Sequence, residues 1–199
     1  MRKWMAVGSM WWILILVVPV YAQQIDLTFG AGPLVAPTSN TSFSGLNQSL
    51  SGGTYLGFGG DFLLKRKFGV GAEVFWRKTQ GLYNSQFPFR PVFWDFNAIY
   101  APTFKKHFAA EVVAGIGAET IRQYGLTSNC DSFGNCSNYV SNTHFMGDVG
   151  GGLRIYPIRG IFVRPEVRIY LVPNNVQFNS SVAVRYGASV GFTLGGRSK

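Results

Sequence analysis

The chain has 199 residues, enough for one ordinary domain, and only 14% of them are charged, against roughly 25% in soluble domains. Aromatic residues make up 16%, there are 25 glycines, and 18 Lys and Arg stand against 9 Asp and Glu. This composition excludes a disordered chain, which would lack aromatic residues, and a coiled coil, because glycine destabilises helix interiors. It favours a β-rich protein with a large apolar surface.

The N-terminus has the pattern of a secretory signal peptide. Arg2 and Lys3 precede an apolar run that ends in small residues at Ala22, where a signal peptidase could cleave. The run is shorter than the roughly 20 residues of a membrane-spanning helix. We therefore expect cleavage after Ala22, with 1–22 as the signal peptide and 23–199 as one exported barrel domain.

After Ala22, apolar residues alternate with small or polar ones in segments of about ten residues, separated by turn residues. The segments lie at about 25–31, 56–64, 68–76, 92–100, 108–116, 145–155, 161–171 and 182–192. Long connections cover about 37–52, 80–90, 121–142 and 172–180, and short ones cover 65–67, 102–107 and 157–160. An even number of strands joined by alternating long and short connections is typical of transmembrane β-barrels.

Charged residues gather on the face opposite the apolar one. Successive side chains of a strand point to opposite faces, and this places eight of the nine acidic residues on the second face: Asp26, Asp61, Glu73, Asp95, Glu111, Glu119, Asp148 and Glu166. The ninth, Asp131, falls in a connection. The arginines of the same face are Arg77, Arg154, Arg164, Arg168 and Arg185.

Alternation alone leaves two orientations open. A soluble, lipocalin-like barrel would bury the apolar face, whereas a membrane barrel would turn it toward lipid. The charged face carries both signs and many glycines, which favours a narrow, ion-paired lumen. Aromatic residues near the predicted strand ends also suit the interfacial girdles of a membrane barrel: Phe68, Trp76, Trp94, Tyr100, Phe108 and Tyr156.

Several features together resemble a known family of barrels. They are the signal peptide, the strand pattern, the aromatic-rich last strand and the glycine-rich stretches Gly57-Phe58-Gly59-Gly60 and 149–154. The chain resembles the eight-stranded outer-membrane barrels: the OmpA transmembrane domain, OmpX and the opacity-type surface proteins. The resemblance implies an all-β, antiparallel, up-and-down barrel in the bacterial outer membrane. It also implies a monomer that contacts outer-membrane lipid and lipopolysaccharide after insertion by the barrel-insertion machinery. Such families usually end on an aromatic residue, but here Phe192-Thr193-Leu194 is followed by five further residues.

Two prolines lie inside predicted strands. Pro33 and Pro165 each lack the N–H that a strand ladder uses. We expect bulges or strand ends at both positions.

An eight-stranded barrel is just wide enough for side chains to fill its interior, and buried carboxylates there need partners. We expect a lumen ion-pair network of Asp61, Glu73, Arg77, Asp95, Glu111, Asp148, Arg154, Arg164, Glu166, Arg168 and Arg185. A sharper alternative, which the resemblance to OmpA allows, is a gate in which one arginine exchanges carboxylate partners and opens a narrow ion path.

Cys130 and Cys136 are the only cysteines, and both lie in the connection 121–142. Behind a secretory signal, such a pair most simply forms a disulfide, here one that constrains a surface tip. A metal site would need further Cys or His nearby, and His144 is the nearest. We therefore predict a disulfide, no metal and no cofactor.

The sequence offers few candidate catalytic residues. Some barrels of this size deacylate lipid A with a Ser that is activated by His, and in that family the Ser lies two residues after a His. Here the residues two positions after His107 and His144 are Ala109 and Met146, so neither histidine matches this pattern. Nucleic-acid binding is disfavoured because there is no basic face with interleaved exposed aromatics. The polar connections 37–52 and 121–142 could bind an extracellular ligand.

These observations predict a small, non-enzymatic outer-membrane barrel with a structural, envelope or surface-adhesion role carried by its extracellular loops. The first alternative is a narrow gated pore for small solutes or ions. The second is a soluble periplasmic binding barrel of the lipocalin kind.

Overall fold

The computed structural model describes residues 24–36, 50–64, 67–83, 87–105, 107–130, 134, 136–173 and 181–195. The predicted signal peptide lies outside these residues, as do most of the connections 37–52 and 172–180. Among the described residues, no helix is long and apolar enough to cross a membrane.

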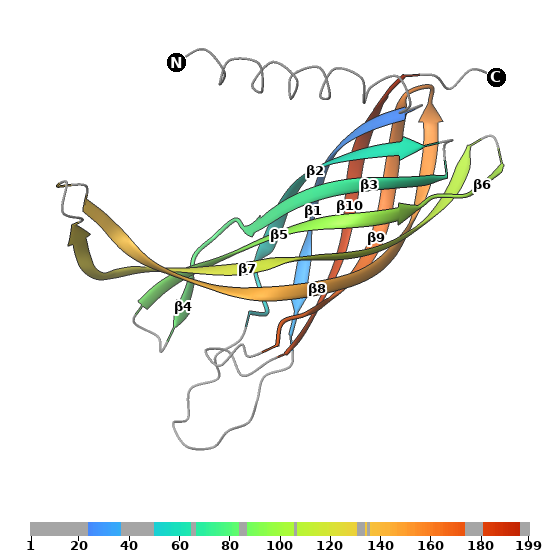
Figure 1. The fold of residues 1–199 in the computed structure, drawn as a ribbon. Coiled ribbons are helices and arrows are strands. Elements are labelled where there is room, and N and C mark those ends of the chain that lie inside the picture. Colours follow the sequence, from blue (N-terminus) through green and yellow to red (C-terminus); the bar gives the residue numbers. More distant parts are fainter. Residues whose placement is uncertain are drawn as a thin grey trace, which may run out of the picture.

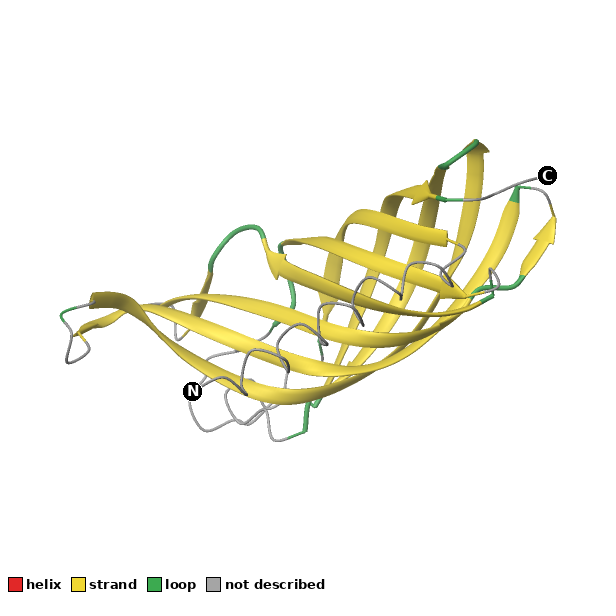
Figure 2. Ribbon diagram, turned by 45° about the horizontal axis from the view of Figure 1, so that its top comes forward, coloured by secondary structure: helices red, strands yellow, loops and turns green. Residues whose placement is uncertain are grey.

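Eight long strands form one closed antiparallel barrel (Figures 1 and 2). They are β1 (Gln24–Val35), β2 (Thr54–Leu64), β3 (Phe68–Arg77), β5 (Phe87–Tyr100), β7 (Phe108–Cys130), β8 (Cys136–Ile158), β9 (Ile161–Leu171) and β10 (Val182–Leu194). The ring closes through the pairing of β1 with β10 and of β5 with β7. Two short strands, β4 (Gly81–Tyr83) and β6 (Thr103–Lys105), extend the hairpins that they belong to. The predicted fold class is confirmed.

The apolar face of every long strand points outward. In β5, Asp95 and Asn97 are buried, whereas Trp94 and Phe96 between and beside them are exposed, Phe96 to 61%. The same alternation exposes Phe58 of β2 and buries Asp61 of the same strand. This is the arrangement of a membrane barrel and the reverse of a lipocalin-like barrel, which would bury the apolar face.

Of the predicted girdle aromatics, Tyr156 is the exception. Its side chain is only 6% exposed and packs inside the barrel against Phe162, with ring centroids 5.4 Å apart. Alternation explains the error, because Arg154 faces the lumen and Tyr156 lies two residues further along the same strand. Phe68 and Trp94, by contrast, are exposed as predicted.

The predicted long loop 121–142 is wrong. Most of it belongs to β7 and β8, which pair as far as Tyr124 and Tyr139, shift register, and pair again up to Cys130 and Cys136. The two strands leave the barrel together as a projecting hairpin (Figure 1). Ile121 at the start of this stretch still packs in the lumen. Beyond it the sequence lacks apolar alternation, because the ribbon leaves the barrel and neither of its faces packs against the barrel core. In the same way, β4 and the start of β5 occupy part of the predicted loop 80–90, and β6 occupies part of the predicted turn 102–107.

The predicted bulges or strand ends at the two prolines are also wrong, because β1 continues past Pro33 to Val35 and Pro165 lies inside β9. Pro33 pairs with Thr54 of β2, and the register of β1 with β10 is the same on both sides of it, although the pairing lapses beside it. Pro165 pairs with Ala188 of β10, and its ladder with β8 likewise lapses and resumes in register. Each proline is therefore accommodated by a local gap in one ladder, without an inserted residue.

Candidate functional site: the filled lumen and the projecting hairpin

Arg154 is the centre of the charged layer inside the barrel. It lies on β8, is fully buried, and donates through Nη2 to Asp61 of β2 at 2.9 Å. Its Nη1 donates to Asp26 of β1 and its Nε to Glu111 of β7. One guanidinium thus binds three buried carboxylates from three other strands. Charges that leave water need such partners, because an isolated buried charge is very costly.

Arg164 of β9 connects this centre to the next carboxylate. Its Nη1 lies 2.7 Å from Glu111 and 3.5 Å from Asp61, and its Nε lies 2.9 Å from Glu166. The same Nε is 3.1 Å from the hydroxyl of Ser189. Asp61 and Glu111 are therefore each shared by two arginines.

Two further arginines continue the network toward the end of the barrel that carries the projecting hairpin. Arg168 contacts Glu73 and Asp148, both at 3.0 Å, and Arg185 contacts Glu73 and Glu166, both at 2.7 Å. The guanidinium of Arg185 also stacks on a ring of the apolar cluster above it, that of Phe75, at 4.4 Å. The charged layer is thus continuous from Asp26 to Glu73.

The structure brings together the predicted network residues, apart from two. Asp95 is buried and accepts a hydrogen bond from Asn97, but it makes no ion pair with a described residue. Arg77 also makes none; it ends β3 above the charged layer, with its guanidinium 5.7 Å from the centre of the Phe89 ring. Asp26 belongs to the network although it was predicted only to share the inner face. The pairing of β1 with β2 was the missed signal. It places Asp26 directly opposite Asp61, and two carboxylates that face each other need a cation.

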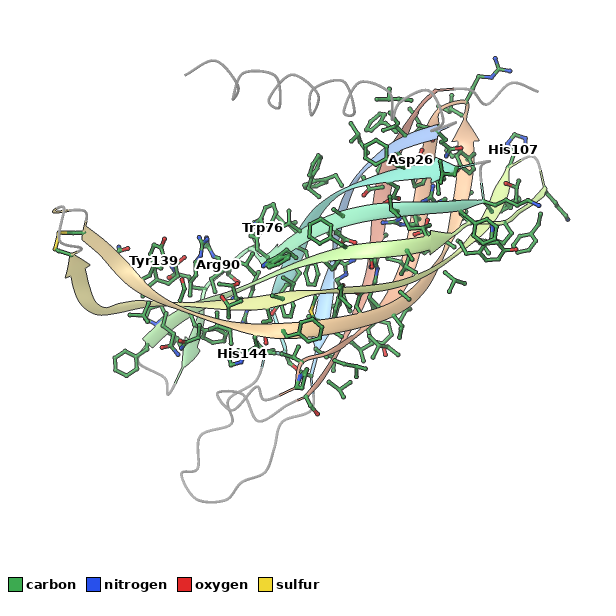
Figure 3. The ribbon with its side chains drawn as sticks, viewed as in Figure 1. Asp26, Trp76, Arg90, His107, Tyr139 and His144 are labelled. Atoms are coloured by element: carbon green, nitrogen blue, oxygen red, sulfur yellow. A yellow bond between two sulfur atoms is a disulfide. The ribbon has the colours of Figure 1, made fainter. Side chains whose placement is uncertain are left out.

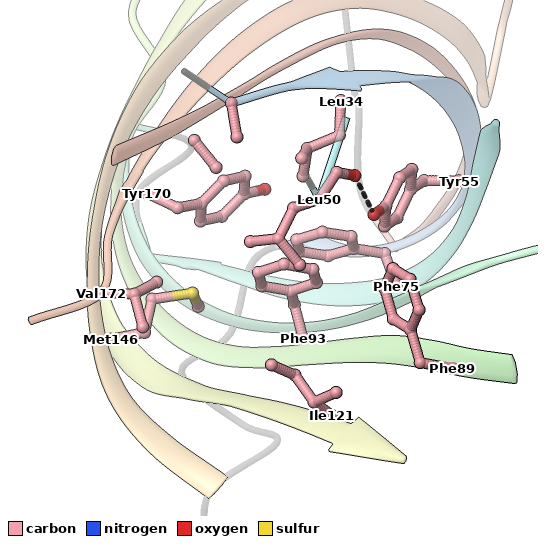
Figure 4. Close-up of a cluster of buried hydrophobic side chains, with 12 residues drawn as sticks. Leu34, Leu50, Tyr55, Phe75, Phe89, Phe93, Ile121, Met146, Tyr170 and Val172 are labelled. Atoms are coloured by element: carbon pink, nitrogen blue, oxygen red, sulfur yellow. Dashed lines mark hydrogen bonds between the residues drawn. The ribbon is translucent and has the colours of Figure 1, made fainter. Parts of the chain in front are cut away.

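Above the ion pairs, toward the projecting hairpin, a cluster of apolar side chains packs in the lumen (Figure 4). Phe75 and Phe93 stack with their centroids 4.7 Å apart, and Tyr170 lies 5.0 Å from Phe75. Leu50, from the end of the connection 37–52, is buried among them, and its carbonyl accepts a hydrogen bond of 2.9 Å from the hydroxyl of Tyr55. The full cluster is Leu34, Ala36, Leu50, Tyr55, Phe75, Phe89, Phe93, Ile121, Met146, Tyr170, Val172 and Ala183.

Sequence reasoning missed this apolar cluster at the hairpin end of the lumen. Strand β3 was assigned to the membrane through Val74 and Trp76, so Phe75 between them received no role. An apolar residue on the charged face of a strand was the available signal. At the other end of the barrel, smaller apolar clusters include Leu63 with Ile99, and Tyr156 with Phe162. Apolar side chains therefore lie at both ends of the charged layer.

The two histidines lie at opposite ends of the barrel (Figure 3). The Nδ1 of His107 is 3.0 Å from the carbonyl oxygen of Tyr156, and His144 lies opposite Glu119 in the β7–β8 ladder. Among the described residues, no group of three or more His, Cys, Asp or Glu side chains could hold a metal ion.

The projecting hairpin is closed at its tip. Cys130 and Cys136 form a disulfide, as predicted, at the last pair of the β7–β8 ladder. Nearer the barrel, the rings of Tyr124 and Tyr139 lie 6.0 Å apart, and the guanidinium of Arg122 lies 5.3 Å from the Tyr139 ring. The tip is thus covalently joined and the base is packed by side chains.

Among solved structures, the fold is similar to several bacterial barrels of low sequence identity. Ail, the attachment invasion locus protein of Yersinia pestis, gives a TM-score of 0.56 at 10% identity, over 86% of this chain and 99% of Ail. The N-terminal β-barrel domain of Pseudomonas aeruginosa OprF gives 0.56 at 15% identity, over 86% and 98%. Neisserial surface protein A gives 0.53 at 11% identity, over 85% and 95%. The chain therefore has the fold of the eight-stranded outer-membrane barrels. No protein-family model and no curated protein sequence matches it.

Proposed function

We propose that the protein is a non-enzymatic barrel of the bacterial outer membrane, with an envelope or adhesion role carried by its extracellular segments. The observation that carries this proposal is the contrast between a lumen filled by ion pairs and rings and a hairpin that projects far beyond the barrel (Figure 1). An interior filled in this way leaves little space for a substrate, whereas loops and hairpins on a rigid scaffold commonly bind partners.

The exterior supports the membrane location. Large apolar side chains such as Phe29, Val70 and Ile116 are more than half exposed, and only lipid or a partner could cover so broad a belt. Export through a signal peptide cleaved after Ala22, insertion by the barrel-insertion machinery, and a monomeric state belong to the same proposal. The structurally similar Ail is described as an attachment protein and has been solved with a heparin analogue, which favours an extracellular ligand here as well.

The first test is gel mobility of the outer-membrane fraction, boiled against unboiled. A folded barrel resists detergent and shifts on boiling, so a shift in this fraction supports the location. A soluble periplasmic protein without a shift would refute it.

The second test removes the hairpin tip. A variant that lacks residues 126–136, and with them both cysteines of the disulfide, should keep the mobility shift because the barrel contacts lie below the tip. Bacteria that display this variant should attach less to heparin-coated and matrix-coated surfaces. The matched control shortens the connection 174–180 instead. Equal attachment by cells with the intact protein, with the tip variant and with no protein would refute the adhesion role.

A second candidate function is the gated pore. The shared positions of Asp61 and Glu111, each contacted by both Arg154 and Arg164, are what a change of ion-pair partner would require. Replacing Glu111 with Ala would then raise single-channel conductance in planar bilayers. Traces that match those of the unmodified protein would remove the gate at this residue.

A further inference from the structure

Two arginines face each other on the outside of the barrel, at the base of the projecting hairpin. Arg90 of β5 and Arg122 of β7 are direct partners in the antiparallel ladder. Both side chains point outward, because the preceding residues Phe89 and Ile121 are buried in the lumen. Like charges directly opposite each other destabilise a strand pair, so this pair calls for a negative partner.

The described part of the chain supplies no such partner. All eight of its acidic side chains face the lumen, and most of them are occupied by the arginines there: Asp26, Asp61, Glu73, Asp95, Glu111, Glu119, Asp148 and Glu166. Arg90 donates to the carbonyl of Lys78 at 3.5 Å, while its Nε has no hydrogen-bond partner among the described residues. Arg122 lies over the ring of Tyr139. Lys78, whose carbonyl Arg90 contacts, is itself exposed and adds a third positive charge near the pair. Among the described residues, no acidic side chain lies on this outward surface.

The ladder fixes the height of the pair above the apolar belt. Trp94 pairs with Ala118, two residues further out Val92 pairs with Thr120, and after two more Arg90 pairs with Arg122. Tyr100, an exposed aromatic residue, ends the same strand at the opposite edge of the belt. The ten residues from Tyr100 to Arg90 span about 33 Å, or about 25 Å along the membrane normal for a strand tilted by about 40°. The apolar band of an outer-membrane barrel is about 25 Å tall, so the arginines lie where the headgroup layer begins.

Two threonines lie between the apolar belt and the arginines. The hydroxyls of Thr120 and Thr143 are 3.1 Å apart, exposed, and on the outward face directly below Arg122 and Ser141. Hydroxyls in this position can exchange hydrogen bonds with a sugar, while a guanidinium binds phosphate through two parallel N–H groups. Figure 3 shows Arg90 and Tyr139 on the same part of the molecule, where the hairpin leaves the barrel.

We propose that Arg90, Arg122 and Lys78 form a binding site for a phosphate group on the sugar headgroup of an outer-leaflet glycolipid, the lipid A part of lipopolysaccharide. The proposal rests on the outer-membrane location proposed above. The bound phosphate supplies the missing negative charge and ties the base of the hairpin to the membrane surface.

The test compares lipid A binding by the complete folded barrel in phospholipid nanodiscs. The variants are Arg90→Gln, Arg122→Gln and both together, and the matched control is Arg159→Gln, which removes one exposed arginine from the turn between β8 and β9 at the other end of the barrel. Hydrogen bonds to charged groups contribute enough for each arginine to change affinity by about tenfold. We expect about tenfold weaker binding for each single variant, a larger loss for the double variant, and no change for the control. Lipid A without its phosphates should bind the unmodified protein as weakly as intact lipid A binds the double variant.

Three results would overturn the proposal. The double variant could bind lipid A as tightly as the unmodified protein, or removal of the phosphates could leave binding unchanged. The double variant could also lose binding to a soluble heparin oligosaccharide while retaining lipid A, in which case the arginines would serve a sulfated glycan from outside the cell. Gel mobility of each variant, boiled and unboiled, keeps these results separate from misfolding. A folded barrel that binds lipid A through the arginines but is absent from outer membranes would refute the proposed location and leave the site intact.

Discussion

Replacing Arg154 with Met tests whether the carboxylates of the ion-pair network are shielded from water. Arg154 is 0% exposed and is the common partner of Asp26, Asp61 and Glu111. Methionine keeps an unbranched apolar chain in the same space but provides no charge and no donor. The substitution therefore removes electrostatic partners with little change in packing.

The magnitude follows from what each carboxylate retains. Asp61 and Glu111 still contact Arg164, whereas Asp26 keeps only the side-chain amide of Gln24, which lies 2.9 Å from both of its carboxylate oxygens. One carboxylate is then left without a cation, and breaking a buried ion pair in this way costs about 3–5 kcal/mol. A second substitution, Asp26→Asn, removes the uncompensated charge and should recover about 2 kcal/mol, within the range found for residues in contact.

The assay is urea unfolding in lipid vesicles, followed by tryptophan fluorescence and by the mobility of unboiled samples. Arg159→Met, at an exposed turn, is the matched control and should change the free energy of unfolding by less than about 0.5 kcal/mol. A loss below about 1 kcal/mol for Arg154→Met, or no recovery in the double variant, would mean that water solvates Asp26. The description of the lumen as filled would then be wrong.

Three other predictions follow from the same structure. Phe93→Ala should lower the free energy of unfolding by about 3–5 kcal/mol, because a fully buried, stacked ring leaves a cavity; a urea titration that shows less than about 1 kcal/mol would contradict the packed cluster. Val112→Arg, on the outward face of β7, should cost about 2–4 kcal/mol in vesicles, whereas Thr120→Arg above the belt should cost at most about 1 kcal/mol; equal costs would argue against a lipid-facing belt. Replacing Cys130 and Cys136 with Ser should leave the urea midpoint unchanged and speed proteolysis of the hairpin tip, since the disulfide closes only a short loop away from the barrel; a lowered midpoint would show coupling to the barrel.

The barrel could be predicted because lipid and lumen impose opposite requirements on adjacent residues. Each outward position in the belt must be apolar or small, and each buried charge must find a partner inside, so a period of two runs through the strands. Asp95 beside Trp94 and Phe96 is one such place. Which residues of each strand face outward, and the inward direction of the acidic side chains, were therefore readable without the structure.

The ion-pair partners and the projecting hairpin could not be predicted from the sequence. Arg154 contacts Asp26 across the interior, and a contact of this kind depends on barrel diameter and strand tilt, which leave no local pattern. Beyond Ile121, which packs in the lumen, the hairpin leaves the barrel, so nothing requires an alternation of apolar residues there. Phe75 and Phe93 were hidden for the opposite reason, because their apolar neighbours already accounted for those strands.

The network also explains why a hairpin on this barrel would have a firm base. In the strand ladder, β8 pairs with β7 and β9 alone among the described strands, yet Arg154 on β8 reaches Asp26 on β1 and Asp61 on β2. These contacts connect opposite walls of the barrel, so they resist changes in its cross-section that the ladders alone would permit. Glu111 and Arg154, which meet in this centre, lie on the two strands that continue outward as the hairpin. The contacts inside the lumen therefore also hold the two strands that continue as the hairpin. For this reason we assign stability to the interior and propose that binding occurs at the hairpin and its base.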